Sequence, residues 1–169
     1  MSIITNVRTI RLEQFPNSIW VEIETDENLT GLGEAWRGTA AIETIIHHDI
    51  CPWLIGQDSR NIELISRTLL TPYVGFHSAS AEIRAASAID IALWDLAGKR
   101  HGIPVYEALG GASRSSIQVY NTCSGYSFNA SSSAHNSGTS RRMITDKDEM
   151  RGPYDDQVAF TRDAGALAK

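Results

Sequence analysis

The sequence predicts an α+β fold: a three-stranded antiparallel meander, a group of helices that covers it, and then the first strand and helix of a β/α unit. Three observations predict it. Apolar and polar side chains alternate over residues 3–36, apolar side chains recur every three or four positions over residues 39–100, and alternation returns over residues 116–122. Such patterns are typical of half-buried strands, amphipathic helices and a further strand, in that order.

The alternation is clearest in residues 19–24, where isoleucine and valine fall on one face of a strand, with Trp20 and two glutamates on the other. Turn-forming residues at 15–17 and 26–28 separate three such strands. The simplest arrangement is an antiparallel meander that ends at Trp36. One face of this sheet would be apolar and would need a cover.

Three helices are predicted to form that cover. The first begins after Thr39, a good N-cap residue, and stops at Pro52. The second follows Asp58-Ser59 and runs over residues 62–71. The third, over residues 81–100, has many alanines, which permit close packing, and it ends at Gly102. Each helix has one apolar stripe, as expected of a helix with one buried face.

A composition break at Gly110-Gly111 follows a last short helical turn and predicts a domain boundary, with one domain over residues 1–112 and the start of another over 113–169. After the strand of the second domain come a long polar loop, 124–151, and a helix that begins near residue 158. A single β/α unit cannot close a sheet. The chain is therefore expected to be the front portion of a larger protein.

The composition excludes several classes of protein. The 169 residues carry 15 basic and 20 acidic side chains, so that the net charge is −5, and the pI is near 5.5. An acidic chain argues against binding to nucleic acid or to an anionic membrane surface. No stretch approaches the roughly 18 consecutive apolar residues of a membrane-spanning helix, and residues 1–10 lack the apolar core of a secretion signal.

The two cysteines, Cys51 and Cys123, lie far apart in a chain that is large enough to fold without disulfides. Free thiols in a reducing compartment are therefore expected, and with them a cytoplasmic location. His47 precedes Cys51 by four residues, a spacing that would put two metal ligands on one helix face. Because no further cysteine or histidine is spaced to complete a tetrahedral site, a partly buried cysteine beside a surface histidine is expected instead.

Four motifs match a known family in their order and spacing. They are Gly31-Leu32-Gly33-Glu34-Ala35, Ile55-Gly56-Gln57-Asp58, the helix motif from Ala86 to Lys99, and the segment from Pro104 to Gly111. Together they resemble the mandelate racemase and muconate lactonizing enzyme family of the enolase superfamily. The resemblance covers most of the chain, and the long helix motif is more specific than a single short pattern.

The resemblance implies that an α+β capping domain precedes a modified TIM barrel, and that the enzyme removes the proton α to a carboxylate. It also implies a Mg²⁺ ion and a lysine or histidine base, because the enediolate intermediate concentrates negative charge that a divalent cation offsets. In the family these residues lie on later barrel strands. No catalytic residue and no metal ligand is therefore expected in this chain; the Mg²⁺ ligands are expected beyond Lys169, and the chain alone is expected to be inactive.

Loops of the capping domain select the substrate in this family, and the matching positions here hold Phe15, Trp36 and Arg37. A guanidinium group offers several donors in a fixed fork, so Arg37 could hold a distal carboxylate or hydroxyl groups; the alternative is an exposed surface arginine. Tyr120 and Asn121 are predicted at the carboxyl end of the first barrel strand, where such enzymes place functional side chains. Alternation puts these two on opposite sides, with Asn121 favoured to face the substrate.

The favoured function is that of a Mg²⁺-dependent sugar-acid dehydratase, because Arg37, Asn121 and the polar loop suit a substrate rich in hydroxyl groups. Racemisation and cycloisomerisation remain alternatives within the family. If the chain were complete, a non-catalytic capping and oligomerisation module would be the alternative. The expected partners are a small carboxylate substrate and further copies of the same chain, without nucleic acid or membrane. Glu34 and Asp95 are expected to make structural hydrogen bonds, to backbone donors or to arginines such as Arg84, and to take no part in catalysis.

Overall fold

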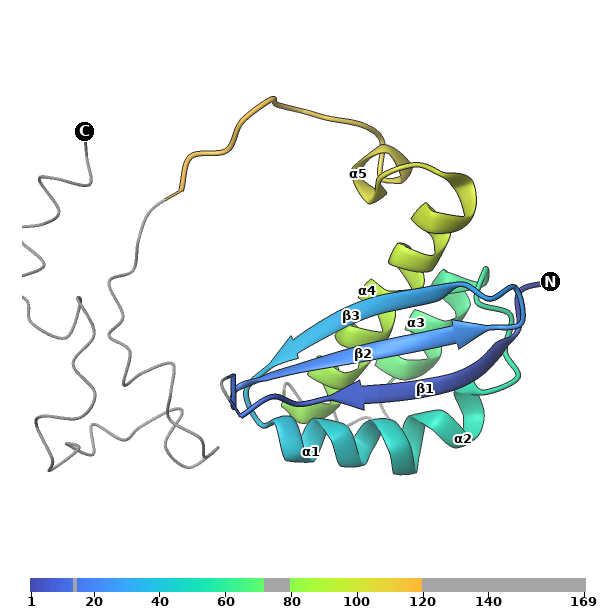
Figure 1. Cartoon of the computed structure of the whole chain (residues 1–169), viewed down its shortest axis with the longest axis vertical. Coiled ribbons are helices and arrows are strands. Elements are labelled where there is room, and N and C mark those ends of the chain that lie inside the picture. Colours follow the sequence, from blue (N-terminus) through green and yellow to red (C-terminus); the bar gives the residue numbers. More distant parts are fainter. Residues whose placement is uncertain (14, 72–79, 120–169) are drawn as a thin grey trace, which may run out of the picture.

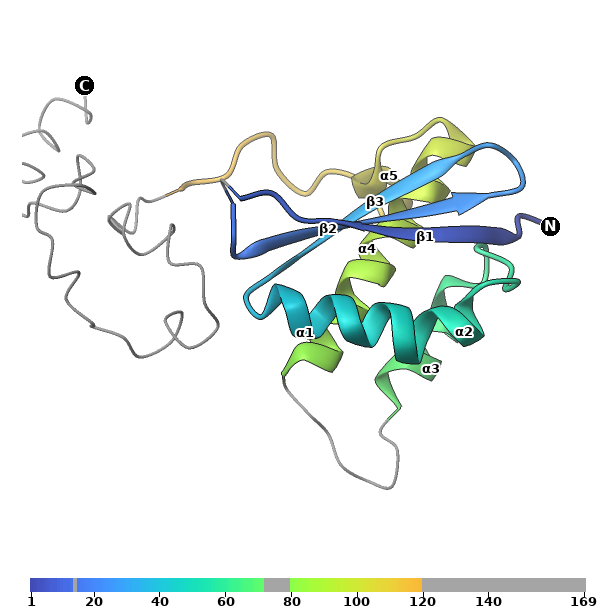
Figure 2. The same ribbon diagram turned by 60° about the horizontal axis from the view of Figure 1, so that its bottom comes forward.

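An antiparallel sheet with helices on one face makes up the part of the chain that the computed structural model describes, residues 1–13, 15–71 and 80–119. Figures 1 and 2 show the helices gathered on one side of the sheet. The strands lie in the order β1-β2-β3, each antiparallel to the next. Their bounds are Ile4–Ile10 for β1, Ser18–Thr25 for β2 and Thr30–Trp36 for β3. The predicted meander is confirmed.

The alternation along β2 separates the two faces of the sheet as predicted. Ile19, Val21 and Ile23 are completely buried against the helices. Trp20, which lies between them in sequence, points to the opposite face and is partly exposed. Because these apolar side chains are removed from water on one face only, they orient the sheet with respect to the helical layer.

The long helix α4, Ala81–His101, packs directly on β3. Glycines make this possible: a Cβ atom on Gly31 would lie 2.1 Å from the Ala92 carbonyl oxygen, and one on Gly33 would lie 1.9 Å from the Ala88 carbonyl oxygen. No side chain fits between strand and helix at these two positions. The alanines of α4 and the glycines of β3 thus form one close contact between backbones.

Side chains from α4 also form hydrogen bonds with backbone groups along the free edge of β3. The Leu32 N–H donates to Asp95 Oδ2 at 2.7 Å, and Lys99 Nζ donates both to the Thr30 carbonyl oxygen and to Asp95 Oδ2 at 2.7 Å. An open edge is a template for pairing with another chain, and these contacts blunt it. The expected structural role of Asp95, with a backbone donor, is confirmed.

The first helical segment differs from the prediction in its helix type, its N-cap and its end. It consists of three parts: α1 (Thr39–Thr44), a π-helical stretch η1 (Ile45–Ile50) and α2 (Cys51–Leu54). Its N-cap residue is Gly38, so Thr39, predicted as the cap, is already helical. Pro52, predicted to stop the helix, lies in the first turn of α2, where its missing N–H costs little. The helix ends instead at Leu54, because Ile55 is extended.

The remaining predicted helices are confirmed. They are α3 (Ile62–Leu70), α4, and the short α5 (Val105–Ala108). One apolar face of α4 is buried, comprising Ala85, Ala88, Ile89, Ala92, Leu93 and Leu96. Gly102, with φ of 67°, ends α4 in the left-handed conformation that its sequence position predicts.

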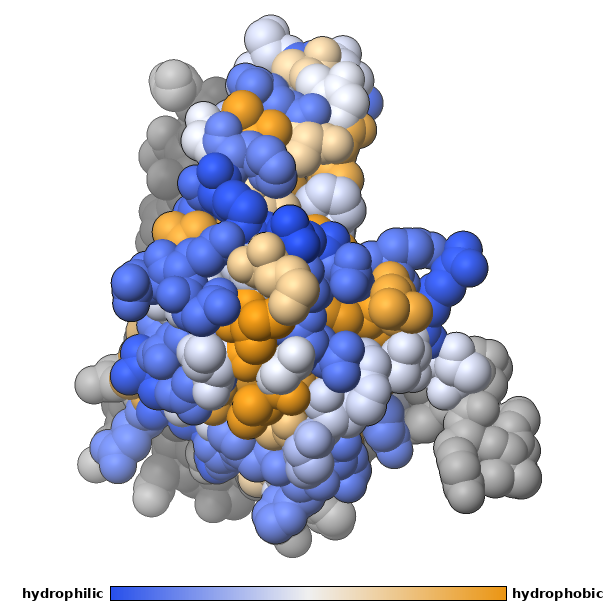
Figure 3. Space-filling view, turned by 90° about the vertical axis from the view of Figure 1, so that its right-hand side faces the viewer, coloured by the Kyte–Doolittle hydropathy of each residue, from blue (hydrophilic) through white to orange (hydrophobic). Residues whose placement is uncertain are grey.

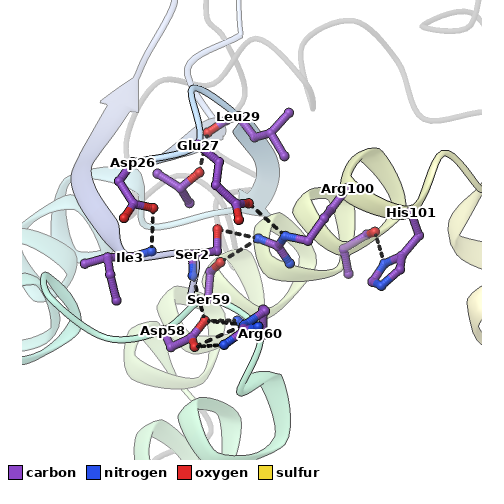
Figure 4. Close-up of polar contacts among 12 residues, drawn as sticks. Ser2, Ile3, Asp26, Glu27, Leu29, Asp58, Ser59, Arg60, Arg100 and His101 are labelled. Atoms are coloured by element: carbon purple, nitrogen blue, oxygen red, sulfur yellow. Dashed lines mark hydrogen bonds and ion pairs between the residues drawn. The ribbon is translucent and has the colours of Figure 1, made fainter.

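A polar cluster near the N-terminus ties four segments together (Figure 4). Arg100, at the end of α4, donates from Nη2 to the Ser2 and Ser59 hydroxyls at 2.6 and 2.9 Å, and from Nε to Glu27 at 3.0 Å. Both serines are fully buried. Asp58 accepts the backbone N–H of Ser2 at 3.2 Å. The guanidinium of Arg100 therefore joins the N-terminal segment, the β2–β3 turn and the turn before α3 to the end of α4.

The predicted strand over 116–122 is not formed in residues 116–119, the part of it that the structure describes. Ile117 and Val119 are 73% and 80% exposed there. A parallel barrel strand forms only beside neighbouring strands, and the sheet of the described residues holds just β1, β2 and β3. Residues 120–122 and the predicted loop and helix lie outside the described residues, so the boundary at 112/113 stays a prediction.

No helix in the described part of the chain is both long and apolar enough to cross a membrane.

Candidate functional site

The turn after β1 and the turn after β3 meet at one end of the sheet. In a β1-β2-β3 meander these two segments follow strands that run in the same direction, so both lie at the same end (Figure 1). The backbone N–H of Arg37 donates to the Asn17 carbonyl oxygen at 2.7 Å. The Thr39 hydroxyl donates to the Pro16 carbonyl oxygen at 3.3 Å. The structure thus brings together the turn after β1 and the turn after β3, in each of which the sequence predicts substrate-contacting residues.

Phe15 stands on the first of these turns. Its N–H donates to the Leu12 carbonyl oxygen, and its own carbonyl oxygen accepts the N–H of Ser18, both at 3.0 Å. The ring is 57% exposed and meets Trp20 edge to face, with ring centroids 6.1 Å apart. Phe15 therefore presents an aromatic surface that Trp20 supports from the outer face of the sheet.

Trp36 and Arg37 form a stacked pair on the second turn. Trp36 is the last residue of β3 and is 43% exposed. The guanidinium carbon of Arg37 lies 4.3 Å from the centre of the Trp36 ring, a cation–π contact. Stacking restricts the guanidinium plane, and restriction lowers the entropy lost when the group binds a ligand.

The backbone of this turn is unusual. Arg37 has φ of 67° and Gly38 has φ of 72°. Two consecutive left-handed residues make a sharp reversal between β3 and α1, and this conformation is unfavourable for a residue with a side chain. Surrounding contacts must therefore hold Arg37 in place.

One of these contacts comes from α4. Arg84 donates from Nη1 to the Arg37 carbonyl oxygen at 3.3 Å. The structure does not pair Arg84 with Glu34 or Asp95, the partners that the sequence suggests. Asp95 binds β3 and Lys99 instead, and Glu34 is exposed on the outer face of the sheet. Sequence reasoning missed the contact to Arg37; the adjacent Gly38, a residue that favours positive φ, was the available signal of a special turn.

The side chains of this turn unit are of the kinds that contact polar or anionic molecules. The Arg37 guanidinium lies over the Trp36 ring, and Phe15, on the adjoining turn, offers a second exposed aromatic ring. A guanidinium group has hydrogen-bond donors and no acceptor, so Arg37 can offer a ligand only donors. The turn unit therefore offers charged donors and aromatic surface, the groups that contact a ligand without reacting with it.

The described residues do not supply a metal site. Within residues 1–13, 15–71 and 80–119, no three His, Cys, Asp or Glu side chains converge to hold an ion, and so the family's Mg²⁺ does not fit here. Cys51 Sγ lies 4.0 Å from His47 Nδ1, while His47 Nε2 is 2.9 Å from the Thr9 hydroxyl. Burial raises the pKa of the Cys51 thiol. The pair is a buried thiol beside an exposed histidine, as expected.

Tyr120 and Asn121, the other two predicted substrate-binding residues, lie outside the described residues. Their role stays a prediction, as do the substrate contacts predicted for Phe15, Trp36 and Arg37.

Comparison with known proteins agrees with the motifs. Residues 6–110 match the family model described as mandelate racemase / muconate lactonizing enzyme, N-terminal domain. A D-mannonate dehydratase of Rhizorhabdus wittichii is 36% identical over 126 residues, and a D-galactonate dehydratase of Ralstonia nicotianae is 39% identical over 124 residues. Each alignment covers 72% of this chain and 31% of the relative. The chain thus spans under a third of the length of these relatives.

Solved structures show the same fold. An enolase protein from the environmental genome shotgun sequencing of the Sargasso Sea is 57% identical, with a TM-score of 0.70, over 76% of this chain and 34% of that one. An enolase from Pantoea ananatis, described with bound D-gluconate and Mg, is 39% identical, with a TM-score of 0.59, over 68% of this chain and 28% of that one. The described sheet and helices therefore match the N-terminal domain of enolase superfamily structures.

Proposed function

This chain belongs to the mandelate racemase / muconate lactonizing enzyme family, and from that premise we propose that it is the N-terminal part of a sugar-acid dehydratase. The described domain would select the substrate, and residues elsewhere in the protein would carry out the chemistry. Relatives named D-mannonate dehydratase and D-galactonate dehydratase support the reaction class.

The observation that carries the proposal is the stacked Arg37–Trp36 pair at the junction of the two turns. A sugar acid offers a row of hydroxyl groups and a carboxylate, which are ligands for the several donors of one guanidinium. Mandelate-like or muconate-like substrates are less polar and would favour apolar side chains at this position. The pair therefore favours dehydration of a hydroxylated acid over racemisation or cycloisomerisation of an apolar one.

The proposed reaction has two bond changes. A base removes the proton from the carbon α to the carboxylate, and the β-hydroxyl group leaves as water after it gains a proton. The resulting enol then tautomerises to a 2-keto-3-deoxy acid, so the net change is the loss of one water molecule. None of the described residues is assigned to the proton transfer; their role is to hold the hydroxylated end of the substrate.

Three further properties belong to the proposal. Dependence on Mg²⁺ is supported by the family and by the metal named for the Pantoea ananatis enzyme. A homo-oligomeric state is supported by exposed apolar side chains such as Leu64 and Ile91. A cytoplasmic location is supported by the free, buried Cys51.

The experiment is a screen of the protein, expressed with the barrel domain that its family carries, against a library of acid sugars in the presence of Mg²⁺. Proton NMR should show the C3 methylene signals of a 2-keto-3-deoxy product with one or a few aldonates. In D₂O, exchange of the α-proton without loss of water would identify a racemase instead. The 169-residue chain alone is expected to give neither signal. Turnover by this chain would contradict the proposal that residues elsewhere in the protein carry out the chemistry.

A further inference from the structure

We propose that Arg84 is a positioning residue for the Arg37 turn, residues 36–38: from α4 it fixes the backbone that lays the Arg37 guanidinium over Trp36. The contribution of this turn to substrate selection rests on the proposed function. The positioning itself depends only on contacts within the described domain.

The peptide groups on both sides of Arg37 are anchored by different elements. The Arg37 N–H donates to the Asn17 carbonyl oxygen, on the turn after β1, at 2.7 Å. The Arg37 carbonyl oxygen accepts from Arg84 Nη1, on α4, at 3.3 Å. Because the N–H and the carbonyl are both held, the left-handed conformation of Arg37 is determined from two directions.

Electrostatic attraction does not explain why an arginine stands at position 84. It lies within the first turn of α4, where the helix dipole disfavours a cation. The nearby Arg37 turn adds a second positive charge and gives no electrostatic attraction. Among the described residues, the contact that the Arg84 side chain makes is the 3.3 Å hydrogen bond from its charged donor to a backbone oxygen.

The base from which Arg84 reaches the turn is rigid. The neighbouring Ala85 is completely buried, and Ala88, one turn further along, lies against Gly33 of β3. The contact between helix and strand is too close for either to slide, so the Arg84 backbone keeps a constant distance from the end of β3. Arg84 thereby holds the Arg37 turn in a fixed orientation with respect to the core of the domain.

The test replaces Arg84 by glutamine in the 169-residue chain and monitors the turn directly. Tryptophan is labelled with 5-fluorotryptophan, the ¹⁹F resonance of Trp36 is assigned with W36F, and exchange of the Arg37 amide is followed by ¹⁵N NMR. In R84Q the Trp36 resonance should shift, and the Arg37 amide should exchange about fivefold faster, the effect of losing one hydrogen bond. The matched control is R67Q on α3, where Arg67 pairs with Glu63 at the surface; it should change neither signal.

An unchanged Trp36 resonance and an unchanged Arg37 exchange rate in R84Q would overturn the proposal. Equal changes in R67Q, or loss of the far-ultraviolet circular dichroism signal in R84Q, would also overturn it, because Arg84 would then be a general stabiliser. R84K keeps a charged donor and is expected to restore part of the protection of the Arg37 amide against exchange. None of these signals needs a substrate, so a failed screen for dehydratase activity would leave this result standing, and the reverse also holds.

Discussion

Arg100 shows how one side chain can satisfy several buried groups. Its side chain is only 15% exposed, and it donates to the hydroxyls of two serines that are fully buried. Nothing in the local sequence indicates these partners, because Ser2 and Ser59 are 98 and 41 residues away from Arg100. The contact arises only when the N-terminal segment and the turn before α3 reach the end of α4.

Replacement of Arg100 by methionine should therefore destabilise the domain. The two serine hydroxyls would lose a charged donor inside the protein, and such losses cost about 2–4 kcal/mol in total. Urea unfolding, followed by circular dichroism, would measure the change. R67M, on the exposed surface of α3, is the control and should stay within about 0.5 kcal/mol of the parent chain. Equal losses in both variants would contradict this role of Arg100.

Asp58 should make stability depend on acid pH. Hydrogen bonds from the Arg60 side chain, and then from backbone N–H groups, hold the pKa of the Asp58 carboxyl well below its usual range. The unfolded chain, with an aspartate pKa of about 3.9, takes up the proton first, so acid favours unfolding. The contribution of Asp58 is fully present above about pH 5 and falls as the pH drops below 4.

The measurement is the urea midpoint at pH 7, 4 and 3. D58N should be less stable at pH 7, and its midpoint should fall less steeply between pH 4 and 3 than that of the parent chain. D49N, on the exposed surface of η1, should keep the parent slope. If the urea midpoint of D58N fell between pH 4 and 3 as steeply as that of the parent chain, other carboxylates would account for the acid sensitivity.

At the level of elements, the β3–α4 contact is the most constrained part of the fold. In G33A the added methyl group would lie 1.9 Å from the Ala88 carbonyl oxygen, so the helix would have to move away from the sheet. Overpacking against a backbone atom should cost about 3 kcal/mol. Thermal unfolding would report it, with E34A, the next position on the exposed face of β3, as the matched control. A loss in E34A as large as that in G33A would contradict the contact.

Most elements could be predicted because burial on one face leaves a period in the sequence. The alternation of β2 and the alanine-rich stripe of α4 both follow from this. The π-helical stretch Ile45–Ile50 could not be predicted, because its apolar spacing fits an ordinary helix equally well. The strand predicted over 116–122 rests on a local pattern, but a strand also needs neighbours, and residues 116–119 have none in the described sheet.

The candidate site was predictable only in part. Phe15 and Arg37 could be placed at one end of the sheet, since the meander order requires it. The left-handed backbone conformation at Arg37 could not be predicted, because a positive φ at a residue other than glycine comes from tertiary contacts. One of these contacts, from Arg84, joins residues 47 positions apart.

For the whole molecule, the surface of the described domain matters as much as its core. Figure 3 shows hydrophobic residues gathered within a largely hydrophilic face. Near the end of the described chain, Tyr106 and Leu109 are 53% and 66% exposed. Apolar surface of this kind favours contact with another domain or with another copy of the chain. Recognition and chemistry would then belong to different domains.

The proposed separation of roles between domains gives a kinetic prediction for the protein expressed with the barrel domain expected from its family. R37Q removes a charged donor that would contact the substrate away from the reacting carbons, so KM should rise about tenfold, the equivalent of about 1.4 kcal/mol. The value of kcat should change less than about threefold, because the proposed function assigns the proton transfer to residues outside the described domain. Steady-state kinetics on the best aldonate of the screen would measure both, with R67Q as control. A large fall in kcat at constant KM would place Arg37 in the transition state and refute its role as a recognition residue.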